Sequence, residues 1–331
     1  MKRFYALLTM CALVALSSAV AEADPIEIKF GITTPVNSPL DLAVKIDMAE
    51  FIKTRSNGKY VIVSYPGCAL GGPDAILQSL QRGSVQFAVE GSANWSTQIP
   101  ELGAFDLPYV FMTKEDAVRY FDSESGKRLG QICEKRVKLT KFMGIECGGF
   151  RQINTTKYYP TLESLKGIPL RSTASKAHIS SIKALGMNPI PVAPSEMSSA
   201  LQQGVIVGTD GEVSGSYAWR MFDICKYNLN PEHLAQLYVT LASGRWWKSL
   251  SKEDQKLFEE GIQVYRKAFT RYLEEKQAET FKKLKEEGVA STWWSEEEKA
   301  RAAQMGRAAW ETATPEQKVV LDEVMHTLYK K

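Results

Sequence analysis

Short β-type segments alternate with amphipathic helical segments along this chain, and the whole alternation occurs twice. In the first set, residues 26–32 alternate apolar and polar side chains, as a half-buried strand does. An apolar stripe from Leu40 to Ile52 predicts a helix, and residues 60–65 and 85–89 predict two further strands. Strands separated by helices build mostly parallel sheets, so this order predicts an α/β lobe.

The same alternation begins again near the middle of the chain. Residues 139–145 and 150–154 have strand character, and short segments at 169–171 and 205–207 predict further strands. A helical stripe through Ile182 separates the last two. Two sets of strands and helices predict two α/β lobes with a cleft between them.

The last third of the chain has the pattern of long helices. Ser251 followed by Asp254, and Ser295 followed by Glu298, are typical of helix N-termini, and Thr314 begins a third helix. No low-complexity linker separates the segments, which favours lobes joined by several short crossings.

The first 23 residues have the composition of a secretory signal peptide. Lys2 and Arg3 precede an apolar stretch over residues 4–16, and small residues then provide cleavage sites that leave Glu22 or Asp24 first. The apolar stretch is too short for a typical membrane span, although an uncleaved anchor is the alternative. We therefore expect export to the periplasm through a cleaved signal peptide covering residues 1–23.

Charge and cysteine content exclude several kinds of partner. The formal net charge is +3, and removal of Lys2 and Arg3 lowers it to +1, so nothing indicates binding to nucleic acid or a membrane surface. The chain has no C-x-x-C pair and only three histidines, so a metal site is not supported. The sequence leaves open whether disulfides form among the mature cysteines, which are Cys68, Cys133, Cys147 and Cys225.

No catalytic motif is present in the sequence. The G-x-S-x-G, P-loop, H-E-x-x-H and G-x-G-x-x-G patterns are all missing. Asp210 and Glu212 have the chemistry for acid–base work, but no nucleophile or cofactor motif accompanies them. His178 is expected at the surface or at the end of a helix. We predict no catalytic residues, no metal and no cofactor.

Two arginines lie where α/β folds bind ligands. Arg171 ends a predicted strand and Arg151 begins another. Ligands in open α/β folds bind at the carboxyl ends of strands, where a guanidinium can hold a carboxylate by two parallel hydrogen bonds. From position alone, a solvated or internally paired arginine is the simpler interpretation.

Five segments resemble, in order, the DctP-type solute-binding proteins of tripartite ATP-independent periplasmic (TRAP) transporters. Together they span essentially all of the mature chain. The segments are GCALGG (67–72), PELGAFDLPYVF (100–111), GFRQINTTKYYPTLESLKG (149–167), LKGIPLRS (165–172) and EMSSALQQGVIVGTDG (196–211).

The resemblance implies a fold of the periplasmic binding protein type, class II. Two α/β lobes would enclose a hinged cleft that closes on its ligand, and long C-terminal helices would brace both lobes. Residues 24–148 with about 234–275 would form the first lobe, and residues 149–233 with about 276–331 the second.

The resemblance also implies a function. A monomer would capture a small organic anion, a carboxylate or a sulfonate, and deliver it to the separate small and large membrane subunits of a TRAP transporter. A periplasmic binding protein of the ABC type and a secreted α/β enzyme are the alternatives.

The family's ligand contacts map onto residues of this chain. Arg171 corresponds to the principal carboxylate anchor and Arg151 to its partner, and we expect neither to contribute much to folding without ligand. The other predicted contacts are Glu90, Trp95, Asp210, Gly211, Glu212 and Tyr217.

Two positions depart from the family's pattern. Gly211 replaces an amide that commonly helps to hold the carboxylate, and Pro194 replaces an aromatic residue that often packs on the ligand. Both changes widen the cleft locally, so a larger ligand group fills the space, or Trp95, Tyr217 or Trp219 does. A core or surface position for these aromatic residues is equally open.

Overall fold

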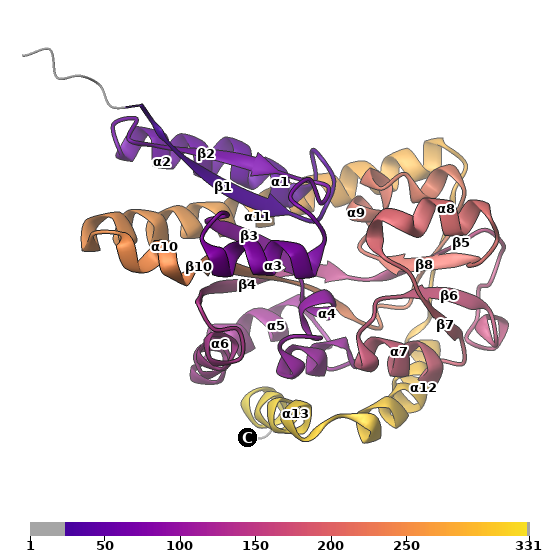
Figure 1. The fold of residues 1–331 in the computed structure, drawn as a ribbon. Helices are drawn as coiled ribbons and strands as arrows, with labels where there is room; N and C mark the ends of the chain where they lie inside the picture. Colours follow the sequence, from indigo (N-terminus) through magenta and orange to yellow (C-terminus); the bar gives the residue numbers. More distant parts are fainter. Residues whose placement is uncertain (1–23, 330–331) are drawn as a thin grey trace, which may run out of the picture.

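The structure, a computed structural model, describes residues 24–329, so the proposed signal segment lies outside the described residues. Two mixed β-sheets, each covered by helices, form two α/β lobes that lie side by side (Figure 1). This arrangement confirms the expected two-lobed α/β fold. Within the described range, no helix combines the length and the apolar composition that a bilayer crossing requires.

The first lobe contains a five-stranded sheet with the order β2-β1-β3-β10-β4. β1 runs parallel to β2 and β3, whereas β10 runs antiparallel to β3 and β4. The strands are β1 (Ile26–Ile32), β2 (Tyr60–Tyr65), β3 (Phe87–Gly91), β4 (Thr140–Phe150) and β10 (Ala235–Ser243).

The second lobe contains a six-stranded sheet with the order β11-β9-β5-β8-β6-β7. β6 runs parallel to β7 and β8, and β5 runs antiparallel to β8 and β9. The strands are β5 (Gln152–Thr155), β6 (Pro169–Ser172), β7 (Asn188–Pro191), β8 (Gly208–Gly211), β9 (Tyr227–Asn230) and β11 (Ala290–Trp293).

Helices cover both sheets, and most of them begin at a side-chain or proline cap. In the first half of the chain they are α1 (Pro39–Leu42), the π-helix η1 (Ala43–Met48), α2 (Ala49–Arg55), α3 (Pro73–Arg82), α4 (Ser92–Trp95), the 3-10 helix η2 (Pro100–Asp106), α5 (Lys114–Phe121) and α6 (Glu124–Arg136). In the second half they are α7 (Lys176–Ala184), α8 (Met197–Gln202), α9 (Val213–Ala218), α10 (Gly244–Ser249), α11 (Lys252–Glu286), α12 (Glu296–Gly306) and α13 (Pro315–Leu328), with short 3-10 turns η3 (Glu163–Leu165), η4 (Pro194–Glu196), η5 (Met221–Asp223) and η6 (Arg307–Thr312).

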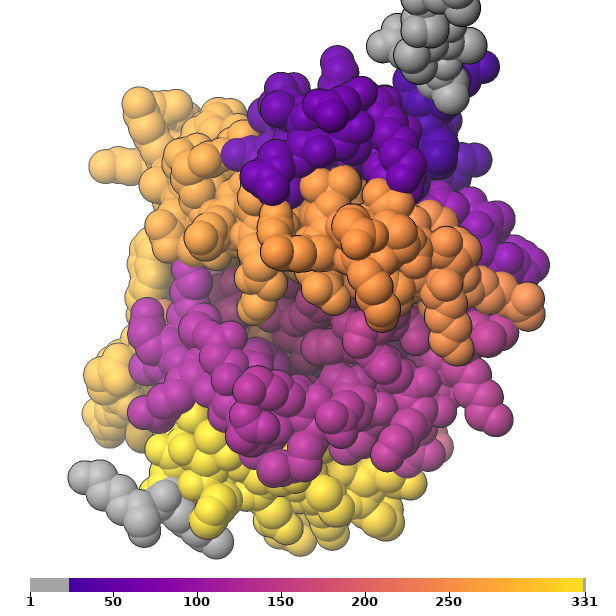
Figure 2. Space-filling model, turned by 90° about the vertical axis from the view of Figure 1, so that its left-hand side faces the viewer, coloured from indigo at the N-terminus to yellow at the C-terminus, as the bar shows by residue number. Residues whose placement is uncertain are grey.

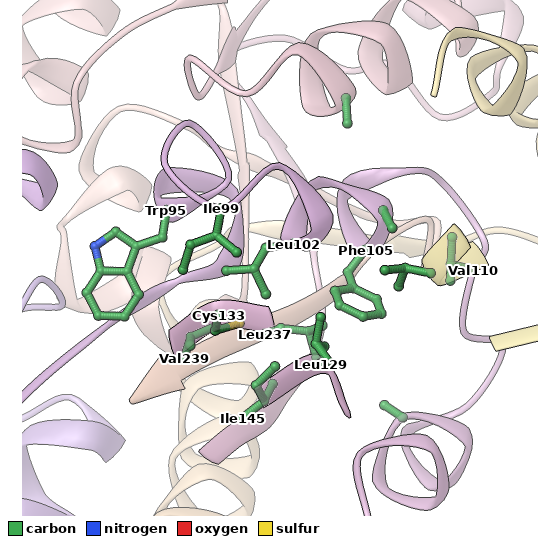
Figure 3. Packing of buried hydrophobic residues seen from close by; sticks show 14 of the residues in the cluster. Trp95, Ile99, Leu102, Phe105, Val110, Leu129, Cys133, Ile145, Leu237 and Val239 are labelled. Carbon is green, nitrogen blue, oxygen red and sulfur yellow. The ribbon is translucent and has the colours of Figure 1, made fainter. Parts of the chain in front are cut away.

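β10 shows how the core of the first lobe is divided. Leu237 and Val239 pack on one face of the sheet with Trp95 and Phe105 (Figure 3). Tyr238, between them in sequence, packs on the other face with the helices around α11. Because successive side chains of a strand point to opposite faces, one buried strand serves two cores. The first lobe is therefore a three-layer arrangement of helix, sheet and helix.

Four stretches of the described chain pass between the lobes: the β4–β5 and β9–β10 connections, helix α11, and the segment from α12 to α13. β4 leads directly into β5 and β9 leads back into β10, so two short crossings are strand-to-strand. The 35-residue helix α11 contacts η1, α1 and α2 of the first lobe and also α9 and β11 of the second. Figure 1 shows this helix running behind both lobes.

The predicted N-caps form at the C-terminal helices. The Ser251 hydroxyl accepts the backbone N–H of Asp254 at 3.1 Å, and Ser295 does the same for Glu298 at 3.1 Å. Thr314 forms a complete reciprocal capping box with its helix. These caps satisfy N–H groups that the first turn of a helix leaves unpaired.

One detail of the predicted second lobe was wrong. The strand expected at 205–207 lies at β8, because Gly208–Gly211 pairs with β5.

The residue boundaries of the two lobes stay a proposal. α13 packs against η2, α5 and α6, all of which precede residue 148. α11 contributes to both lobes. We propose that the last helix belongs with the first lobe, although it is distant in sequence.

The cysteines of the described residues are all free thiols. Cys133, Cys147 and Cys225 are buried, and Cys68 is half-buried. Burial raises the pKa of Cys68 to about 11 and that of Cys133 to about 12. Both thiols are therefore protonated at neutral pH and are poor nucleophiles.

A hollow lies on the outer side of the first lobe, between α11 and the pair α5 and α6. Figure 2 shows it between the magenta and orange segments, and one cavity of about 290 Å³ within it is lined by Glu146, Arg266 and Lys114. Glu146 is 4% exposed, and its Oε1 lies 3.4 Å from Nε of Arg266. Burial raises the pKa of Glu146 to about 7, although Arg266 and Thr240 oppose this.

Replacing Glu146 by Gln is expected to change how stability depends on pH. A carboxyl with a raised folded-state pKa holds its proton in the folded state between pH 4.5 and 7. Its contribution to stability is complete below the unfolded pKa and is lost as pH rises through the folded pKa. The loss is about 1.4 kcal/mol for each pH unit that separates the folded and unfolded pKa values. Urea unfolding at several pH values should show less decline from pH 4.5 to 7 in Glu146→Gln than in the parent. Exposed Glu275→Gln is the control, and identical slopes in all three proteins would contradict the prediction.

Candidate functional site

A cavity of about 110 Å³ lies between the two lobes, and we call it the cleft cavity. The first lobe lines it with residues at the ends of β1 and β3 and with the start of β10, and the second lobe with residues from β6 and β8. The carboxyl ends of the parallel strands therefore face the cavity, as is typical of ligand sites in α/β folds. Six of the eight predicted contacts line it: Glu90, Arg151, Arg171, Asp210, Gly211 and Glu212.

Arg171, on β6, lines the cleft cavity. The residue is 5% exposed, and its Nε donates to the carbonyl of Val192 at 3.0 Å. Among residues 24–329, neither terminal nitrogen of Arg171 has a hydrogen-bond or ion-pair partner. Burial and the neighbouring Arg151 lower the pKa of Arg171 to about 10, so the side chain remains charged at neutral pH. This arrangement leaves a planar fork suited to two oxygens of an anion.

Arg151 also lines the cavity, but most of its guanidinium is already paired. Its Nε lies 2.7 Å from Oδ2 of Asp210, and its Nη2 donates to Oδ1 of the same carboxylate at 2.9 Å. Nη1 donates to the side-chain oxygen of Gln236 at 2.8 Å. The expectation that Arg151 contributes little to folding is therefore revised, because its loss would strand a fully buried carboxylate.

Asp210 lies at the centre of this buried polar cluster. Burial alone would raise its pKa, but Arg151 and then His178 hold the pKa well below its usual value. Nε2 of His178 lies 3.0 Å from Oδ2 of Asp210, and Nε2 of His233 lies 3.6 Å away. Asp210 is thus an ionised structural carboxylate at neutral pH, and its charge is balanced by Arg151.

The position of His178 differs from the expectation in one respect. The residue lies near the start of α7, as a helix-end histidine would, but it is 1% exposed rather than on the surface. Its Nδ1 lies 3.2 Å from the backbone nitrogen of Thr173, and its Nε2 faces Asp210. Burial lowers the pKa of His178, so the ring is neutral at pH 7.

Glu90, at the end of β3, is a second buried carboxylate of the cavity wall. Oε1 accepts the backbone N–H of Gly91 at 2.6 Å and the amide of Asn94 at 2.9 Å, and Oε2 accepts the hydroxyl of Thr33. Burial raises the pKa of Glu90, whereas these donors and Arg171 favour its ionised form. Unlike Asp210, which pairs with Arg151, Glu90 forms no ion pair with an arginine of residues 24–329.

Glu212 lines the cavity but also caps a helix. Its Oε1 accepts the N–H of Ser214 at 2.9 Å, and its Oε2 accepts the N–H of Gly215 at 2.9 Å, at the start of α9. Gln277 of α11 donates to Oε1 at 3.0 Å. These contacts give Glu212 a structural role, and burial nevertheless raises its pKa.

Gly211 and Pro194, the two residues that depart from the family pattern, both lie on the wall of the cleft cavity. A Cβ atom added at Gly211 would lie 3.0 Å from the hydroxyl of Ser216, so that hydroxyl occupies part of the space. On the same side, Met197 and Trp219 give the cavity an apolar surface. Of the three aromatic residues considered for this space, Trp219 is the one that lines it.

Trp95 is a correction to the predicted site. The residue is 1% exposed and packs with Ile99, Leu102 and Phe105 in the core of the first lobe (Figure 3). It ends the short helix α4, and its neighbour Asn94 lines the cavity instead. Ala93 and Asn94 of α4 both line the cavity, and the next step of about 100° around the helix turns Trp95 into the core.

Tyr217 is the second correction. Its hydroxyl donates to Oε1 of Glu287 at 2.6 Å, and its ring packs against Phe222 and lies 5.5 Å from Nζ of Lys283. The residue lies outside the wall of the cleft cavity. In α9, Ser216 lines the cavity, whereas Tyr217 lies against the C-terminal end of α11.

Sequence reasoning missed several polar residues of the cavity wall. Thr33, Asn94 and Gln236 come from the first lobe, and Thr173 from the second. None of these four belongs to a segment quoted above. Their only signal is position, since most of them lie at or just beyond a strand end. Among the described residues, no cluster of His, Cys, Asp and Glu has the arrangement of a metal site.

Comparison with known proteins gives concordant results. Residues 30–317 match the protein family DctP, described as "Bacterial extracellular solute-binding protein, family 7". The C4-dicarboxylate-binding periplasmic protein DctP of Vibrio cholerae is 27% identical over 70% of this chain and 70% of its own length. The sialic acid-binding periplasmic protein SiaP of Vibrio cholerae is 23% identical over 85% of this chain and 87% of its own length.

A solved structure shares the fold at low identity. The sugar acid binding protein DctPAm from Advenella mimigardefordensis strain DPN7T, in complex with galactonate, superimposes with a TM-score of 0.85. The alignment covers 92% of this chain and 99% of that protein, at 24% identity.

Proposed function

Since this chain belongs to family 7 of the bacterial extracellular solute-binding proteins, the DctP family, we propose that it captures a small organic acid in the cleft cavity. Membership of this family argues against the alternative of a periplasmic binding protein of the ABC type. Its relatives named above are binding proteins, and the absence of catalysis in this chain is part of the proposal.

One observation carries the proposal: the guanidinium of Arg171. Arg171 lines the cavity, is buried and is charged at neutral pH, and its two terminal nitrogens have no hydrogen-bond or ion-pair partner among residues 24–329. A carboxylate accepts two parallel hydrogen bonds from such a fork, and a sulfonate presents two oxygens in a similar way. Arg151 supports this site, because one N–H of its Nη1 remains beyond the bond to Gln236.

We propose that ligand binding draws the lobes together. The cavity wall is divided between the lobes, so a ligand held by Arg171 also contacts the ends of β1 and β3. The strand crossings that join the lobes are short, which suits a hinge. The closed, monomeric protein would then dock on separate membrane subunits of a TRAP transporter.

We place this process in the periplasm. The two relatives from Vibrio cholerae are named as periplasmic proteins, and residues 1–23 have the composition of a signal peptide. Intact-mass measurement of exported protein should give a chain that begins at Glu22 or Asp24. Retention of Lys2 and Arg3 would contradict this localisation.

A thermal-shift screen is expected to find stabilising ligands among organic acids only. A ligand that binds the folded state alone stabilises it by about 2.7 kcal/mol at a hundredfold excess over Kd. Each acid should be tested beside a neutral analogue of the same skeleton, for example galactonate beside galactitol. Stabilisation by neutral or cationic compounds, with none by acids, would contradict the proposed function.

A further inference from the structure

Five charged side chains line the cleft cavity, and three of them belong to an ion pair or a helix cap. Arg151 and Asp210 form a buried ion pair of 2.7 Å, and Glu212 caps α9. The two that remain are Arg171, from the second lobe, and Glu90, from the first. The described wall therefore offers one unpaired cation and one anion without an arginine partner.

From this balance we propose that the ligand carries a single carboxylate and several hydroxyl groups, and that Glu90 selects against a second carboxylate. The inference rests on the proposed function, because it takes Arg171 as the anchor. An acid held by Arg171 must extend toward the first lobe, where Glu90 forms part of the wall. Burial raises the pKa of Glu90, but its three protein donors and the charge of Arg171 favour the ionised form. A second carboxylate there would meet this like charge in a poorly solvated space.

The same carboxylate suits a hydroxyl group. Glu90 receives three donors from the protein, at Thr33, Gly91 and Asn94, and an ionised carboxylate has about four acceptor positions. One position remains for an O–H donor of the ligand. The hydrogen bond to an ionised acceptor is stronger than one between neutral groups.

Neutral polar groups make up much of the remaining wall. Thr33, Thr173 and Thr209 carry hydroxyls that both donate and accept, and Asn94 and Gln236 carry amides with both functions. A chain or ring with several hydroxyls can satisfy such a surface, whereas an unsubstituted fatty acid would leave it unpaired. No lining residue in the described part of the chain offers a second free cation for another carboxylate.

One side of the wall is apolar and complements the carbon skeleton of such a ligand. Trp219, Met197, Met221 and Pro194 lie together on the second-lobe side of the cavity. The C–H groups of a polyhydroxylated chain or sugar ring can pack against this surface while the hydroxyls face the polar residues. A hydroxylated monocarboxylate, such as a sugar acid, matches all three parts of the wall.

The test compares acids that differ by one functional group. Isothermal titration of the parent should use gluconate, galactonate and glucuronate, the corresponding dicarboxylates glucarate and galactarate, and also succinate, hexanoate and glutamine. We expect at least one hydroxylated monocarboxylate to bind, with its dicarboxylate partner at least tenfold weaker, and hexanoate and glutamine weaker still.

The variant Glu90→Gln tests the selecting residue. It keeps the size of the side chain and removes the charge. The ratio of the dicarboxylate Kd to the monocarboxylate Kd should therefore fall by about tenfold or more. Exposed Glu275→Gln should leave this ratio unchanged. Unliganded melting curves check the fold, and the ligand series on the parent stands even if Glu90→Gln unfolds.

The outcomes separate this inference from the proposed function. The inference is wrong if succinate, glucarate, galactarate, hexanoate or glutamine binds the parent as tightly as the best hydroxylated monocarboxylate. The proposed function, capture of an organic acid, would still be supported by any acid that binds. An unchanged ratio in folded Glu90→Gln would overturn the role of Glu90. If no acid binds, the proposed function fails and the inference fails with it.

Discussion

Replacing Arg171 by Ala is expected to weaken binding of the preferred acid by about thirty- to several-thousand-fold, or about 2–5 kcal/mol. The reason is that, of the guanidinium groups in residues 24–329 that line the cavity, Arg171 is the one fully available to the ligand carboxylate, in a site that closure would shield from water. Arg171→Lys keeps the charge but loses the planar fork, so it should also bind clearly more weakly than the parent.

The variant Arg171→Ala should fold normally without ligand. In the unliganded protein the Arg171 side chain makes a single bond, from Nε to the carbonyl of Val192 at 3.0 Å, and a lost bond of this kind costs about 1 kcal/mol. Removing the charge also relieves its repulsion with Arg151. Titration calorimetry and unliganded melting curves measure the two effects, and Arg245→Ala in α10 is an exposed control. Parent-like binding, or unfolding of the unliganded variant, would show that Arg171 is a structural residue.

Replacing Arg151 should have the opposite profile, with a large loss of stability before any ligand is added. Arg151→Met leaves Asp210 ionised and without its main partner in a fully buried position. Breaking a buried ion pair from one side costs about 3–5 kcal/mol, because the remaining charge is uncompensated. Urea unfolding at pH 7 measures this loss.

A double variant separates the charge effect from lost packing. Arg151→Met combined with Asp210→Asn removes both charges, so it should recover a large part of the stability that Arg151→Met loses. The exposed pair of Lys127 and Glu124, 2.6 Å apart, provides a contrast, and Lys127→Met should give no measurable change. If Arg151→Met were as stable as the parent, the ion pair would have no structural role.

The position of Arg171, the proposed anchor, was predictable because local sequence indicates it. The segment Leu165–Ser172 contains a turn and a short strand with Arg171 near its end. Its role as anchor comes from the resemblance to a family and stays a proposal. Glu90, at the end of β3, was predictable in the same way.

The pairing of Arg151 could not be predicted in this manner. Its partners Asp210 and Gln236 are 59 and 85 residues away in sequence, and no pattern indicates that the three converge. The strand that carries Gln236 was also missed. β10 is buried along nearly its whole length, so it lacks the alternation that marks a half-buried strand.

The errors at Trp95 and Tyr217 have a different origin. Both residues lie in segments that do reach the cleft cavity, since Asn94 and Ser216 line it. The direction of each side chain depends on the rotation of a short helix, α4 or α9. That rotation is set by packing against the rest of the fold, which residue spacing alone does not specify.

The continuity of α11 has a mechanical consequence for any movement of the lobes. At 1.5 Å per residue, its 35 residues form a rod of about 52 Å that is fastened to both lobes. Sharp helix kinks occur mainly at proline, glycine or a bulge, and α11 contains no proline. Its single glycine, Gly261, lies against Ile52, where an added Cβ would be 2.8 Å from a side-chain carbon. Closure of the lobes would therefore flex the rod along its length and store elastic energy, which would reduce ligand affinity and drive the return to the open form.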